Sequence, residues 1–116
     1  MKPILVVLLL LGAAALVANH TVYVTVNCTG PWPEAPYVHA GAQLTGNACY
    51  WAYGYASQVF EIEVSDLYPS STVVAKVQWN GYEWTNSCHK GTPSTSITVT
   101  CPYPTELEDD DDPPNT

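Results

Sequence analysis

Hydrophobic and polar residues alternate along several segments of this chain, with the two-residue period that is typical of half-buried β-strands. The first segment places Val22, Val24 and Val26 on one side and polar residues on the other. Three later segments repeat the pattern, and their expected inward residues are Phe60, Ile62 and Val64, then Val73, Ala75, Val77 and Trp79, then Ile97, Val99 and Cys101. No segment shows a helical period, so the pattern predicts an all-β domain.

Turn-forming residues separate these segments. Residues 66–71 combine Asp, Pro and Ser in a predicted turn, and Asn80-Gly81 is a strong signal of a two-residue hairpin. About seven short strands with such turns between them are typical of an immunoglobulin-like antiparallel β-sandwich. We therefore expect this fold class.

The two ends of the chain differ in composition from the body. A lysine precedes an apolar run at residues 4–17, with alanines at 13–15 and 18, which indicates a secretory signal peptide over residues 1–18. The run is shorter than the roughly 20 apolar residues that span a bilayer. Residues 105–116 are acidic and predicted to be disordered, which leaves one domain at 19–104. We expect a secreted, extracellular protein that is not membrane-bound after cleavage.

Charge and reactive residues limit the classes of function. Beyond the signal segment there is no arginine, and the only lysines are Lys76 and Lys90, so a nucleic-acid partner is not expected. The few histidines and carboxylates form no evident catalytic or metal-binding motif. We therefore expect no enzymatic activity, no cofactor and no bound metal, and a monomeric protein.

The four cysteines of an exported chain imply two disulfides, for which the sequence permits three connectivities. Cys28 and Cys101 end the first and last strands on their apolar sides, which favours a Cys28–Cys101 bond and leaves Cys49–Cys88 as the second. Asn27-Cys28-Thr29 is an N-glycosylation sequon, and the strand pattern turns Asn27 outward.

The aromatic residues divide by their place in the alternation. Trp79 follows the apolar register and is expected in the core, whereas Trp51 and Trp84 lie outside it and beside cysteines. His39 is expected on the surface, because Val38 and Ala40 occupy the apolar side of that segment. Rigid exposed aromatic rings suit the apolar face of a sugar ring, so these residues form a candidate carbohydrate site.

Two short motifs resemble a known family. Residues 35–39 (Ala-Pro-Tyr-Val-His) resemble the proline, aromatic, aliphatic, histidine strand of family 25 starch-binding modules. The hairpin at 77–86 resembles their Asn/Gly turn followed by Trp and Asn, and residues 59–77 resemble paired strands of family 20 and 48 modules. The resemblance implies a noncatalytic β-sandwich that binds α-glucan, a polysaccharide or oligosaccharide of the starch and glycogen type.

The resemblance also implies roles for individual residues. It assigns ring contacts to His39, Trp51 and Trp84, and hydrogen bonds to sugar hydroxyls to Asn86 and Asn80. A secreted protein-interaction domain (an effector, inhibitor or matrix protein) is the alternative, because exposed aromatic residues also mark protein interfaces. A third reading makes the two tryptophans part of the packed interior.

Overall fold

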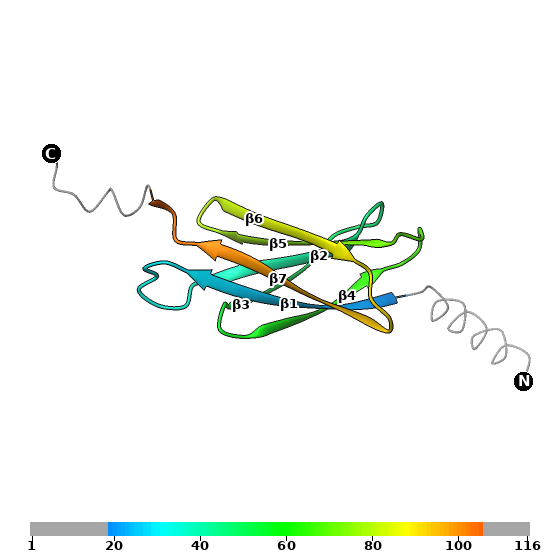
Figure 1. The fold of residues 1–116 in the computed structure, drawn as a ribbon, viewed down its shortest axis with the longest axis horizontal. Coiled ribbons are helices and arrows are strands. Elements are labelled where there is room, and N and C mark those ends of the chain that lie inside the picture. Colours follow the sequence, from blue (N-terminus) through cyan, green and yellow to red (C-terminus); the bar gives the residue numbers. More distant parts are fainter. Residues whose placement is uncertain (1–18, 106–116) are drawn as a thin grey trace, which may run out of the picture.

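The computed structural model describes residues 19–105, so the predicted signal peptide and all but the first residue of the predicted acidic tail lie outside the described residues. Seven strands form two stacked sheets (Figure 1), which confirms the prediction of a seven-stranded β-sandwich. The strands are β1 (Asn19–Thr29), β2 (Tyr37–Leu44), β3 (Tyr50–Tyr55), β4 (Val59–Ser65), β5 (Thr72–Trp79), β6 (Tyr82–His89) and β7 (Ser94–Pro102).

The core lies between the two sheets and consists of the inward residues of the alternating segments. Val22, Val24, Val73, Val77 and Val99 are fully buried, as the sequence pattern predicts. β-branched valines fit this position well because their stiff side chains pack on a pleated surface. The core is therefore built mainly from small aliphatic side chains.

The strand order differs from the predicted immunoglobulin-like arrangement. The three-stranded sheet has the order β4-β1-β7 and the four-stranded sheet the order β3-β2-β5-β6. An immunoglobulin constant-type sandwich instead groups the first strand with the second, fifth and fourth. In addition, β1 and β7 pair in parallel, so the sandwich is not purely antiparallel. The alternation specifies which face of a strand is buried, but it contains no information about the neighbouring strand.

The Asn80-Gly81 hairpin forms as predicted, with positive φ values of 51° at Asn80 and 83° at Gly81. These values match a two-residue hairpin turn, in which both central residues have positive φ. The turn sets Trp79 opposite Tyr82, and the register continues along the strands to place Val77 opposite Trp84. Directly opposed residues in a sheet point to the same face, so Trp84 faces the core side together with Val77.

The cysteines contradict the predicted pair of disulfides, because all four are free thiols. Cys28 and Cys101 are in register on β1 and β7, as the predicted bond requires. Cys49 precedes β3 and Cys88 lies in β6, at opposite edges of the four-stranded sheet. Two strands lie between these edges, which corresponds to about 14 Å at the usual strand spacing. Because a disulfide needs Cα atoms within about 7 Å, the predicted Cys49–Cys88 bond is wrong.

Candidate functional site

The outer face of the four-stranded sheet carries a group of aromatic side chains at one side. Trp51, Tyr53 and Tyr55 of β3 alternate with residues that turn to the core side, and their cross-strand neighbours on β2 are Gly41, His39 and Tyr37. The three tyrosines are 52–59% exposed. We call this surface the aromatic face, and its members are Tyr37, His39, Trp51, Tyr53 and Tyr55.

Trp51 lies over Gly41, and the missing side chain of that glycine makes room for the indole. A Cβ atom built on Gly41 would lie 2.7–2.9 Å from three carbons of the six-membered indole ring. Gly41 is itself buried, and Trp51 is half-buried. The ring is therefore packed on the sheet over the backbone of β2 and still presents part of its surface to solvent.

The remaining rings of the aromatic face contact one another in cross-strand pairs. Tyr37 and Tyr55 have their ring centroids 5.2 Å apart at an interplanar angle of 80°. His39 and Tyr53 are 4.4 Å apart at 76°. These edge-to-face contacts are the geometry that aromatic pairs prefer. Each pair holds its two rings at a large angle, so the face presents tilted rings and not one coplanar surface.

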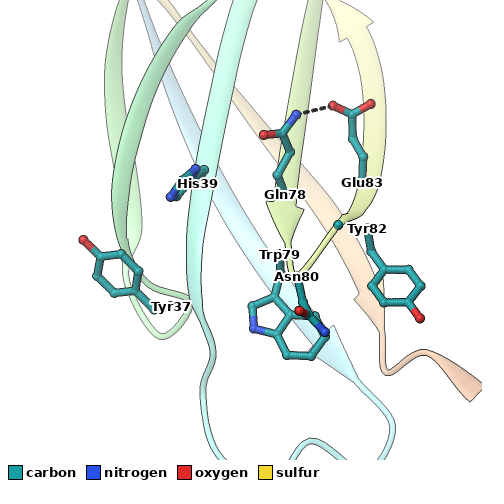
Figure 2. Close-up of a pocket in the computed structure, with 8 residues that line it drawn as sticks. Tyr37, His39, Gln78, Trp79, Asn80, Tyr82 and Glu83 are labelled. Carbon is teal, nitrogen blue, oxygen red and sulfur yellow. Dashed lines mark hydrogen bonds between the residues drawn. The ribbon is translucent and has the colours of Figure 1, made fainter. Parts of the chain in front are cut away.

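A cavity of about 480 Å³ opens beside the aromatic face, at the end of the sheet where β5 turns into β6. Figure 2 shows Gln78 and Glu83 facing each other across this hairpin, with the Gln78 Nε2 donating to the Glu83 Oε2 at 2.8 Å. The amide and the carboxylate add polar groups to a site that is otherwise largely aromatic. The full lining is Tyr37, His39, Gln78, Trp79, Asn80, Gly81, Tyr82 and Glu83.

Three of the five residues predicted for a sugar site lie at this surface. His39 and Trp51 belong to the aromatic face, and Asn80 lines the adjoining cavity. His39 is exposed, as the sequence pattern predicts. Lys76 of β5 is in register with Gly41, so its half-buried side chain extends the same outer surface beside Trp51.

Trp84 and Asn86 lie on the opposite face of the sheet, so the predicted grouping of Trp84 with His39 and Trp51 is wrong. Trp84 is half-buried and packs against the core, with its ring 6.3 Å from that of Trp32. The Asn86 Nδ2 donates to the Thr98 carbonyl at 2.8 Å, which ties β6 to β7. Both residues therefore hold the sandwich together.

Trp84 belongs to a cluster of rings that closes one end of the sandwich. Trp32 is at the centre, with its ring centroid 4.9 Å from those of both Trp79 and Tyr103. Its indole nitrogen donates to the Cys101 carbonyl at 3.0 Å. Trp79, predicted for the core, is half-buried in this cluster. The interpretation that places both tryptophans in the packed interior therefore fits the position of Trp84 but not that of Trp51.

Sequence reasoning did not identify the tyrosines of the aromatic face, although a signal for them exists. The segment Trp51-Ala52-Tyr53-Gly54-Tyr55 alternates aromatic and small residues with a period of two. That period predicts a strand with all three large rings on one face. Gln78 and Glu83 are also identifiable, because a two-residue Asn80-Gly81 turn sets them opposite each other.

The chain matches no protein-family model, no curated protein and no solved structure. Within residues 19–105, no three or more His, Cys, Asp or Glu side chains are grouped so that they could hold a metal ion. The same described segment contains no helix that is long and apolar enough to cross a membrane. The aromatic face and its adjoining cavity are therefore the surface on which a functional proposal can be based.

Proposed function

We propose that this protein binds a glycan on the aromatic face without altering it chemically, and that the ligand is an α-glucan. The packing of Trp51 over Gly41 is the observation that carries the proposal, because it holds an indole on the same face of the sheet as three exposed tyrosines. The apolar face of a pyranose ring stacks on such rings. The choice of α-glucan rests on the resemblance of the strand at residues 35–39, because Trp84 and Asn86 of the second motif lie on the other face of the sheet. The large angles between neighbouring rings agree with a curved polymer.

The chemistry of the adjoining cavity complements the rings. Stacking buries apolar area, and each stacked ring contributes about 1–3 kcal/mol. The side chains of Gln78, Glu83 and Asn80 offer donors and acceptors for sugar hydroxyls. A few rings and hydrogen bonds of this kind correspond to dissociation constants between about 1 μM and 1 mM. Binding to a polymer with many equivalent sites is therefore the practical readout.

Depletion of the protein from solution by insoluble starch tests the proposal. We expect wild-type protein to be retained, and we expect Trp51→Ala and Tyr53→Ala each to reduce retention at least fivefold. Tyr68→Ala is the matched control, because Tyr68 is 63% exposed in the connection between β4 and β5. Starch should also retain the Trp84→Phe variant, since Trp84 lies on the inner face of the sheet. Full retention of both aromatic-face variants would exclude this surface as the glycan site.

A protein partner is the second candidate, and the abundance of exposed tyrosine favours it. Tyr and Trp are enriched among the residues that dominate protein interfaces. In that case a purified partner should bind in a manner that Trp51→Ala abolishes, whereas starch and a panel of oligosaccharides should show no binding.

The proposal includes export of the protein and its processing. Asn27 is exposed on the outer face of the three-stranded sheet, where an attached glycan would stay clear of the aromatic face.

A further inference from the structure

The edge strand β3 lacks the features that usually prevent sheet edges from associating. β3 pairs only with β2, and its sequence Tyr-Trp-Ala-Tyr-Gly-Tyr contains no charged residue and no proline. Natural edge strands are commonly protected by charges, prolines, bulges or a covering segment. An uncharged, aromatic edge of six residues is therefore an available surface for another strand.

The other three sheet edges are protected. Glu61 and Glu63 lie along β4 and Glu83 lies in β6. The side chain of Asn86 ties β6 to the facing strand β7, which itself ends at Pro102. Among the edges of the described sandwich, β3 alone has neither a charge nor a proline.

The alternation of aromatic and small residues in β3 is symmetric about Tyr53, so a second copy of this chain can match the β3 edge residue for residue. The described residues include two lysines and five carboxylates, so two copies repel each other over most of their surface. No charge lies within β3, so repulsion is smallest at this edge. An antiparallel pairing of identical strands is also closed by a two-fold axis, which limits assembly to a dimer.

We propose that two copies pair antiparallel through β3, with the two-fold axis at Tyr53. Opposed residues in a continuous sheet share a face, so outward residues of one copy must meet outward residues of the other. With the axis at Tyr53, the two Tyr53 side chains oppose each other, and Trp51 opposes the partner's Tyr55. On the inner side, Ala52 opposes the partner's Gly54.

The pairing joins the two four-stranded sheets into one and places the two aromatic faces side by side. Cross-strand aromatic pairs stabilise such a junction. The contact involves only six residues of each copy, so the dimer belongs to the weak, transient class of interfaces. The inference concerns the strand edge and does not depend on the proposed glycan ligand.

Sedimentation equilibrium of the secreted protein, without added glucan and at up to roughly 1 mM protein, would detect any dimer whose dissociation constant is below that concentration. We expect a dimer for the wild type. Tyr53→Lys and Tyr53→Glu should each weaken it about tenfold or more, because like charges then oppose each other at the axis. An equimolar mixture of the two variants should restore association as a mixed dimer. Tyr68→Lys, at an exposed tyrosine away from β3, is the matched control and should leave the dimer unchanged.

Two results would overturn the inference: a wild type that stays monomeric throughout this range, or a dimer that Tyr53→Lys leaves intact. Failure of the mixed variants to associate would also exclude an axis at Tyr53. Far-ultraviolet circular dichroism of each variant separates loss of pairing from loss of fold. The sedimentation experiment contains no added glucan, and starch retention can be measured at concentrations at which the protein is monomeric, so each proposal can fail while the other stands.

Discussion

The contact between Gly41 and Trp51 predicts a specific coupling between the two positions. In Gly41→Ala, the new Cβ would lie 2.7 Å from the nearest indole carbon. Carbon atoms in contact are usually about 3.5–4.0 Å apart, so the ring must move by about 1 Å. The backbone itself accepts alanine, because Gly41 is not among the residues with positive φ.

Two opposing effects determine the free energy of unfolding of Gly41→Ala. Alanine in the middle of a strand stabilises by about 0.5–1 kcal/mol relative to glycine. Displacing a packed ring costs about 1–3 kcal/mol, as for other overpacked sites. We therefore expect Gly41→Ala to be neutral or destabilising by up to about 2.5 kcal/mol in the wild type. When Trp51 is alanine the ring is absent, and the same substitution should stabilise by about 0.5–1 kcal/mol.

Urea unfolding of the wild type, both single variants and the double variant measures this coupling as a double-mutant cycle, with an expected value of about 1–3 kcal/mol. Far-ultraviolet circular dichroism is the suitable probe, because removal of Trp51 alters tryptophan fluorescence. An equal change on Gly41→Ala in both backgrounds would show that Trp51 does not rest on Gly41, and the central observation of the proposed site would be refuted.

Two further predictions concern His20, near the start of β1, and the cysteines. His20 is buried and lies 2.7 Å from the Thr95 hydroxyl, and burial, followed by the charge of Lys90, lowers its pKa below the usual 6.5. The unfolded chain therefore binds the proton more readily, so this contribution to stability is complete above pH 6.5 and is lost as the pH falls below it. The urea concentration at the unfolding midpoint should fall less between about pH 7.5 and pH 5 in His20→Gln than in the wild type. An equal fall in both proteins would show that protonation of His20 is not its cause. Among the four free thiols, Cys101 should react last with an alkylating reagent, because burial, with a smaller effect of Cys28, raises its pKa to about 12. Mass mapping of the alkylated peptides gives the order of reaction, and early alkylation of Cys101 would contradict this prediction.

Much of the local structure could be predicted from the sequence, because period-two alternation and turn chemistry act over only a few residues. The alternating valines identify the buried side of β1, and Asn80-Gly81 specifies a hairpin of defined register. That register, combined with the buried position of Val77, was already sufficient to place Trp84 on the inner face. The tyrosines of β3 were likewise accessible from their alternation with small residues.

The pairing of distant strands could not be obtained in this way, because every strand presents the same backbone groups to any neighbour. Only the tertiary structure shows that β1 and β7 run parallel and that β3 lies at a sheet edge. It also shows that Cys49 and Cys88 are separated by the width of the four-stranded sheet. By itself, the sequence determined which side chains are buried and where the chain turns, since both depend on neighbouring residues. The tertiary structure decided which rings share a surface, since that depends on contacts between strands far apart in the chain.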